Sequence, residues 1–229
     1  MSSGRVETVL LDAGGVLLDL DYAFVKRLLD ARHVATTVLA LSLAESIART
    51  TIDHRVREGG RSSDAWRDYF RILLTRVGVP PEWTDEIIDT LADAHERVGL
   101  WTVPIDGAID TVQELRRSGY RLGVVSNAEG RVERDLEGAG FAGLFGTVVD
   151  SHLVGVEKPD PRIFHIAMER LGASAETTVF LGDVPSVDVA GARAAGLRPV
   201  LLDRHDLYAD ADAARVTSIR DLPTILATI

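Results

Sequence analysis

Residues that could handle a phosphoryl group occur at four places along the chain, each after a short apolar run. They are Asp12, Ser126 with Asn127, Lys158, and Asp183 with Asp188. The first, second and fourth stand directly at the end of their runs, and Lys158 follows the third run within ten residues. Each signal is weak alone. Together and in this order they are a strong indication of a site.

The chemistry that these side chains suit is the transfer of a phosphoryl group. A carboxylate such as Asp12 can attack phosphorus directly and divide hydrolysis into two steps through an aspartyl phosphate. Because a phosphate ester is anionic, the attack needs a cation, and Mg²⁺ prefers oxygen ligands such as Asp12 and Asp183. Lys158 would place an ammonium against the charge of the equatorial oxygens. Donors to those oxygens would be the Ser126 hydroxyl and the backbone amides near Ala13 and Asn127.

Each of these residues also has an ordinary structural interpretation. Asp12 could be a turn residue, and Ser126-Asn127 could cap the helix that follows, as Asn127 is expected to do in either case. Lys158 could be a solvated loop lysine. Asp188 lies at a predicted helix start, where an acidic residue is stabilised by the helix dipole. The order of the four motifs favours the functional interpretation.

The elements that must hold these residues alternate between strands and helices. Short apolar runs typical of buried parallel strands lie at residues 7–11, 121–125, 147–149, 178–181 and 198–202. Helical segments ended by glycine lie between them, at residues 106–117, 129–137, 161–171 and 186–195. This alternation predicts an α/β fold with a doubly wound, Rossmann-like parallel sheet, which binds ligands at the carboxyl ends of its strands.

A helical insertion interrupts the alternation after the first strand. Amphipathic segments follow one another at residues 22–32, 37–58, 63–77 and 84–98. We therefore expect a sheet domain of residues 1–18 and 102–229 and a helical domain of residues 19–101. Three clustered aromatic residues, Trp66, Tyr69 and Phe70, are expected to pack in a core. Four arginines of the insertion could contact an anionic substrate, namely Arg49, Arg55, Arg57 and Arg61.

In the order of its motifs the chain resembles the haloacid dehalogenase superfamily, over the whole sheet domain. The resemblance implies Asp12 as nucleophile, Ser126 as a phosphate-binding residue, Lys158 as a catalytic residue, and Asp12, Asp183, Asp188 and the Gly14 carbonyl as ligands of Mg²⁺. It also implies that the helical insertion is a small cap of the phosphatase-type subgroup, which closes over the site and carries most substrate contacts. The expected function is magnesium-dependent hydrolysis of a small phosphorylated metabolite.

Gly14 departs from the pattern of the family's phosphatases, which carry a second Asp two residues after the nucleophile. That carboxylate protonates the leaving alkoxide and later deprotonates the attacking water, and its loss typically costs on the order of 10²- to 10⁴-fold in rate. A good leaving group, as in an acyl or aryl phosphate, could depart unprotonated. Otherwise a histidine of the insertion could replace the acid, the candidates being His33, His54 and His95.

The glycine at this position is also compatible with three different functions. A dehalogenase would attack carbon with the same Asp12 and no metal, but its fourth motif differs from Gly182-Asp183. A phosphonate-cleaving enzyme would need a cap lysine for a Schiff base, and Lys26 is the only lysine in the insertion. The third possibility is a weakly active or non-catalytic relative that binds a phosphorylated metabolite or a protein.

Composition restricts the classes of function further. The 229 residues contain no cysteine, which excludes disulfides and a cysteine nucleophile and leads us to expect a cytoplasmic location. The net charge of −10 disfavours a nucleic-acid partner. No apolar run reaches the length of a membrane span, and no secretory signal is recognised at the N-terminus. The oligomeric state stays open.

Overall fold

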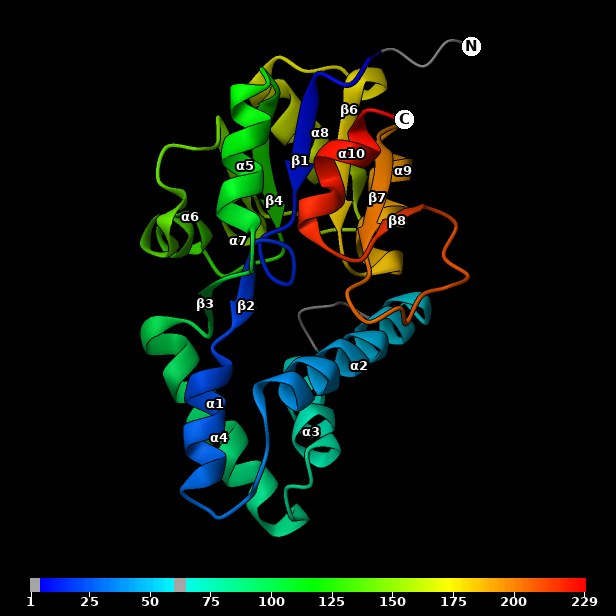
Figure 1. The fold of residues 1–229 in the computed structure, drawn as a ribbon. Coiled ribbons are helices and arrows are strands. Elements are labelled where there is room, and N and C mark those ends of the chain that lie inside the picture. Colours follow the sequence, from blue (N-terminus) through cyan, green and yellow to red (C-terminus); the bar gives the residue numbers. More distant parts are fainter. Residues whose placement is uncertain (1–4, 60–64) are drawn as a thin grey trace. The chain divides into compact units, whose positions relative to one another are not determined.

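The computed structural model describes residues 5–59 and 65–229, which divide into two compact units (Figure 1). The sheet unit comprises the chain up to Asp19 and from Thr102 to Ile229, and the helical unit comprises Leu20–Trp101. Two segments connect the units, β2 (Leu18–Leu20) and β3 (Trp101–Pro104), and they pair with each other as a two-stranded sheet. The helical unit is therefore one continuous insertion in the chain of the sheet unit.

Six parallel strands form the sheet, in the order β5-β4-β1-β6-β7-β8. They are β1 (Thr8–Leu11), β4 (Arg121–Ser126), β5 (Thr147–Asp150), β6 (Thr178–Gly182), β7 (Arg198–Leu202) and β8 (Ala214–Val216). β1 and β6 are buried along their whole length, as expected where helices cover both faces. The predicted doubly wound parallel sheet is confirmed. The edge strand β8 was not predicted, because its three residues contain no apolar run.

Helices cover both faces of the sheet (Figure 1). α5 (Ala108–Arg117) and α10 (Leu222–Leu226) lie on one face, and α8 (Pro161–Leu171) and α9 (Ala190–Ala194) lie on the other. α8 has its predicted bounds because the Asp160 side chain caps its first turn and Gly172 ends it in the left-handed conformation. The shorter segments are α6 (Val132–Leu136), η2 (Glu137–Phe141), α7 (Ser151–Val154), η3 (Ala175–Thr177), η4 (Pro185–Val189) and η5 (Ile219–Asp221).

Two predicted helices of this unit differ from the observed ones. The helix expected at residues 129–137 begins only at Val132, and a π-helical segment, η2, continues it. The helix expected at residues 186–195 is divided into the π-helical segment η4 and the short helix α9. π-Helical turns are frequent at functional sites, and η4 carries Asp188.

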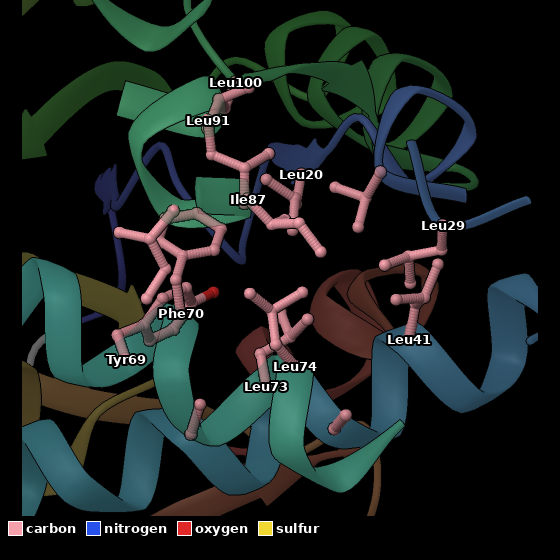
Figure 2. Packing of buried hydrophobic residues seen from close by; sticks show 14 of the residues in the cluster. Leu20, Leu29, Leu41, Tyr69, Phe70, Leu73, Leu74, Ile87, Leu91 and Leu100 are labelled. Carbon is pink, nitrogen blue, oxygen red and sulfur yellow. The ribbon is translucent and has the colours of Figure 1, made fainter. Parts of the chain in front are cut away.

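Four helices make up the helical unit, α1 (Tyr22–Asp30), α2 (Val38–Arg57), α3 (Trp66–Arg76) and α4 (Pro81–Val98). They enclose a core of their own, in which side chains from α3 such as Phe70 and Leu74 lie among Leu20, Ile87 and Leu91 (Figure 2). The expected packing of the aromatic cluster is confirmed, since Tyr69 and Phe70 are buried and Trp66 packs against this core. α4 begins three residues before its predicted start because Pro81 takes its first position.

A buried carboxylate, Glu45, organises the polar part of this core. It accepts hydrogen bonds from the Tyr22 and Tyr69 hydroxyls, the latter at 2.6 Å, and its Oε1 lies 2.6 Å from Arg49 Nη2 and 3.3 Å from Trp101 Nε1. A buried carboxylate needs such partners to remain charged. Arg49, one of the candidate substrate contacts, thus forms a buried ion pair with Glu45 in the helical unit.

The other candidate arginines have partners on the same unit or cannot be placed. Arg55 pairs with Asp68, and Arg57 Nη2 lies 2.7 Å from Asp53 Oδ2. Arg61 lies outside the described residues. Among the helices that the structure does describe, none is both long enough and apolar enough to cross a membrane.

Candidate active site

The candidate site lies at the carboxyl ends of three neighbouring strands, β4, β1 and β6. Asp12 follows β1, Ser126 is the last residue of β4, and Asp183 follows β6. From β1 the chain adds β4 and β5 on one side and β6, β7 and β8 on the other. Open parallel sheets bind ligands at such a reversal of strand order, so the predicted residues stand where this fold favours a site.

Lys158 stands between two carboxylates at this edge. Its Nζ lies 2.8 Å from Asp12 Oδ2 and 2.8 Å from Asp188 Oδ1. The Lys158 side chain is only 1% exposed, and its ammonium lies 5.2 Å from the centre of the Phe180 ring on β6. Lys158 is therefore not a solvated loop lysine. It is a buried cation, held by two anions and an aromatic face.

Asp188 uses both of its carboxylate oxygens inside the sheet unit. Oδ1 faces Lys158, and Oδ2 accepts hydrogen bonds from the backbone amides of Asp183 and Val184, each at 2.9 Å. The close approach requires a glycine before Asp183, since a Cβ on Gly182 would lie 2.3 Å from the Asp188 Cβ. Asp188 thus links the position of Lys158 to the loop that carries Asp183.

Burial and charge act in opposite directions on the pKa values of this group. Burial raises the pKa of Asp12, Lys158 opposes that rise, and the charge of Asp188 adds to it, so that the pKa lies above its usual value. Burial would lower the pKa of Lys158, but the carboxylates of Asp12 and Asp188 outweigh burial and raise it. Lys158 is therefore held as an ammonium.

Among the described residues one group of carboxylates could hold a metal ion. It consists of Asp12, Asp183 and Asp188, whose ligand oxygens lie within 4.8 Å of one another. The donor set is oxygen alone, which is what Mg²⁺ prefers. The residues therefore fit the expected ion. Within this group Asp188 has three protein partners, the Lys158 ammonium and the backbone amides of Asp183 and Val184.

The loop after Asp12 is held tightly by its own backbone. The Ala13 amide donates to Asp12 Oδ1 at 2.7 Å, and the Ala13 carbonyl accepts from Leu17 and Leu18 at 2.8 and 2.9 Å. In the Gly pair only Gly15 has a positive φ, of 79°. Gly14, the expected carbonyl ligand, has a backbone conformation open to other residues, so turn geometry does not explain its lack of a side chain.

Asn127 has a different role from the one expected. Helix α6 starts at Val132 with no side-chain cap, so the expectation that Asn127 caps it is wrong. The Asn127 carboxamide instead accepts a hydrogen bond from the Lys158 amide at 2.7 Å and donates one to the Lys158 carbonyl at 2.9 Å. The loop after β4, which carries Ser126 and Asn127, is thereby joined to the segment that carries Lys158.

Two residues that were not expected from the sequence hold the same loop from β5. Asp150, 2% exposed, accepts from the amides of Gly130 and Val132 at 2.8 and 3.3 Å. The Ser151 hydroxyl accepts from the Ala128 amide at 3.0 Å and donates to the Ala128 carbonyl at 3.2 Å. An Asp-Ser pair directly after an apolar run is a helix-start signal and could have drawn attention to this position.

The candidate substitutes for the missing acid lie in the helical unit. His33 and His54 are exposed there. His95 packs among aromatic rings, 5.9 Å from the Trp66 ring and 5.5 Å from the Trp101 ring between centroids. Lys26, the candidate Schiff-base lysine, lies 2.6 Å from Asp30 on the surface of α1. These contacts favour structural or surface roles for His95 and Lys26.

A family model for haloacid dehalogenase-like hydrolases matches residues 6–196 of the chain. Phosphoserine phosphatase of Thermus thermophilus is 35% identical over 154 residues, which are 67% of this chain and 60% of that protein. Glyceraldehyde 3-phosphate phosphatase of Methanopyrus kandleri is 32% identical over 154 residues, 67% of this chain and 65% of that protein. The chain thus matches less than two thirds of the length of these relatives.

Solved structures share the fold at lower sequence identity. The HAD-hydrolase YfnB from Bacillus subtilis, bound to magnesium, superposes with a TM-score of 0.69 at 21% identity and covers 97% of this chain and 99% of its own. The L-2-haloacid dehalogenase RSc1362 gives a TM-score of 0.65 at 21% identity, covering 98% and 100%. A protein named as a dehalogenase thus shares the fold of this chain, and the fold alone does not distinguish a phosphatase from a dehalogenase.

Proposed function

This chain belongs to the haloacid dehalogenase-like hydrolases, and on that basis we propose that it is a magnesium-dependent phosphatase that acts on a small phosphorylated metabolite. The observation that carries the proposal is the carboxylate group of Asp12, Asp183 and Asp188 around Lys158. Three carboxylates suit a hard divalent cation, whereas displacement of a halide at carbon requires none. The curated relatives named as phosphatases support the same choice.

The proposed reaction has two steps, both on Asp12. A carboxylate oxygen of Asp12 attacks phosphorus, the bond from phosphorus to the ester oxygen breaks, and the alcohol leaves as its oxyanion. Water then attacks the phosphorus of the aspartyl phosphate, which releases inorganic phosphate and regenerates the carboxylate. Lys158 lies 2.8 Å from the attacking group, where its charge balances that of the phosphoryl oxygens. Ser126 is proposed to donate a hydrogen bond to those oxygens.

Asp12 and Asp183 would hold Mg²⁺ together with the Gly14 carbonyl. Asp188 would hold Lys158 and the loop that carries Asp183 in place. Bound there, the ion supplies positive charge to the phosphate oxygens and favours the ionised form of Asp12. The stabilisation of the ionised form matters because the pKa of Asp12 is raised and only the carboxylate form attacks phosphorus.

The missing carboxylate at Gly14 narrows the proposed substrates. No side chain at this position can protonate a leaving alkoxide. We propose that the preferred substrates have leaving groups of low pKa, such as acyl or aryl phosphates, which depart without a proton. Gly14 also favours a second candidate function, a weakly active or non-catalytic binder of phosphorylated metabolites.

The experiment that separates the two is phosphate release from an aryl phosphate, with and without Mg²⁺. We expect turnover that depends on the metal and is abolished in Asp12→Asn. A matched control is Asp212→Asn, the same chemical change at a carboxylate that is 93% exposed, and it should retain full activity. If no aryl or acyl phosphate is turned over while phosphate binds in the presence of Mg²⁺, the chain is a binder.

A further inference from the structure

Asn127 holds the backbone of Lys158 with both ends of its carboxamide. Its Oδ1 accepts from the Lys158 amide at 2.7 Å, and its Nδ2 donates to the Lys158 carbonyl at 2.9 Å. The two contacts resemble those by which one residue of an antiparallel sheet pairs with the N–H and C=O of the residue opposite, here made by a side chain. It joins the loop after β4 to a residue 31 positions farther along the chain.

The position of the Lys158 backbone matters because a long stem joins it to the buried ammonium. A lysine stem has four rotatable carbons, so the ammonium position depends on where the Cα is held. The residue after Lys158, Pro159, is restricted as well, because Gly191 packs closely against it. A Cβ on Gly191 would lie 3.0 Å from the Cα and from the carbonyl oxygen of Pro159. Asn127 on one side and Gly191 on the other thus fix the segment from which the Lys158 ammonium reaches Asp12 and Asp188.

We propose that Asn127 is a positioning residue, which acts on phosphoryl transfer by fixing the backbone of Lys158. The proposal rests on the proposed function for its catalytic consequence, while the contact itself is a property of the fold. It assigns the Asn127 side chain a role separate from the phosphate contact expected of its backbone amide. The effect on the reaction passes through the Lys158 ammonium.

The loop offers a matched control on its other side. The Ser151 hydroxyl makes the same two-way contact with the backbone of Ala128, the residue after Asn127, at 3.0 and 3.2 Å. It holds the same loop, but through Ala128 and not through Lys158. Ser151→Ala therefore removes a comparable restraint and leaves the contact between Asn127 and Lys158 in place.

The test is a double-mutant cycle with an aryl phosphate and Mg²⁺. Asn127→Ala should lower kcat about 10²-fold, the scale expected when a catalytic group is displaced by about 1 Å. Ser151→Ala should change kcat less than about threefold. In the Lys158→Ala background, Asn127→Ala should have almost no further effect, because the ammonium that it positions is gone. An equal loss in both backgrounds would overturn the proposal.

Hydrogen exchange at the Lys158 amide provides a readout that does not need activity. Exchange should be faster in Asn127→Ala than in the unchanged chain and in Ser151→Ala. Unchanged exchange would show that the contact does not hold Lys158 and would also overturn the proposal. If Asn127→Ala does not fold, Asn127→Leu keeps the approximate side-chain volume but loses both the acceptor and the donor, and the same results are expected of it. Absence of turnover in the unchanged chain would instead refute the proposed function, and hydrogen exchange would still decide on the contact.

Discussion

Replacing Gly182 by alanine should dislodge Asp188 and destabilise the sheet unit. The added Cβ would lie 2.3 Å from the Asp188 Cβ, 2.4 Å from its Cγ and 2.6 Å from its Oδ2. Gly182 is buried at the end of β6, and its neighbour in this contact is the near end of a short side chain. Rotation about the side-chain bonds of Asp188 does not move the Asp188 Cβ, so it cannot relieve the overlap with the added Cβ. The backbone of β6 or η4 therefore has to move.

The cost can be worked out from the hydrogen bonds that Asp188 would lose. Its Oδ2 accepts two backbone amides, from Asp183 and Val184, at 2.9 Å each. A hydrogen bond to a charged group contributes about 1.5–3 kcal/mol. Two at the lower limit give about 3 kcal/mol, before any contribution from the ion pair with Lys158. The same displacement would move Asp183 and Lys158, so activity should fall together with stability.

Urea unfolding followed by far-ultraviolet circular dichroism measures this loss. Gly138→Ala is the control, since a Cβ there would meet nothing within 4 Å and its φ is not positive. We expect Gly138→Ala to leave the free energy of unfolding unchanged within about 1 kcal/mol. If Gly182→Ala unfolds at the same urea concentration as Gly138→Ala, the close packing of Asp188 over β6 is not a tight constraint and the reasoning fails.

Three further predictions concern the helical unit and the loop after Asp12. Glu45→Ala should lower the free energy of unfolding by about 3–5 kcal/mol, because it breaks the buried ion pair with Arg49 and removes the acceptor of the Tyr69 hydroxyl. Tryptophan fluorescence reports the loss, since all three tryptophans lie in this unit. Burial, and then the charge of Glu45, raise the pKa of Tyr69 well above its usual value. The contribution of Tyr69 to stability is therefore fully present below about pH 10, the pKa in the unfolded chain, and is lost as the pH rises toward the higher pKa in the folded chain. The urea midpoint of unfolding should accordingly fall less with rising alkaline pH in Tyr69→Phe than in the unchanged chain. Gly14→Asp, at a position whose φ permits a side chain, should raise the turnover of alkyl phosphates more than that of aryl phosphates, and an equal effect on both would show that protonation of the leaving group is not limiting.

The strands and their terminal residues could be predicted because both depend on local sequence. A buried parallel strand needs an apolar run, and the run ends where polar side chains reach the edge of the sheet, as at Asp12 and Ser126. The convergence of these ends then follows from the rules of parallel sheets. By contrast, β8 contributes only three residues, two of them half-buried, and its pairing with β7 depends on the whole sheet already being formed.

Side-chain partners could not be predicted, since they depend on register between distant segments. Ser126 lies opposite Asp150 in the pairing of β4 with β5, and this register brings Asp150 and Ser151 to the loop after β4. The sequence around Asn127 shows a residue that often caps helices, but not that Lys158 lies within its reach. Likewise Gly182 looks like a simple strand end until the π-helical turn η4 brings Asp188 back over it.

The balance of charge at the site constrains both candidate functions. The three carboxylates of Asp12, Asp183 and Asp188 and the ammonium of Lys158 together carry a net charge of two negative units when all are ionised. Such a group repels a phosphate, whether the phosphate is to be hydrolysed or only bound. Burial raises the pKa of Asp12 most, and the charge of Asp188 adds to that rise. One divalent cation would cancel the net negative charge, so Mg²⁺ should raise the affinity for phosphate. Asp183→Ala removes one carboxylate, and it should weaken the binding of the metal and reduce the amount by which the metal improves phosphate affinity. Calorimetric titration of phosphate with and without Mg²⁺ measures both quantities, and phosphate affinity that is the same with and without the metal would contradict this view of the site.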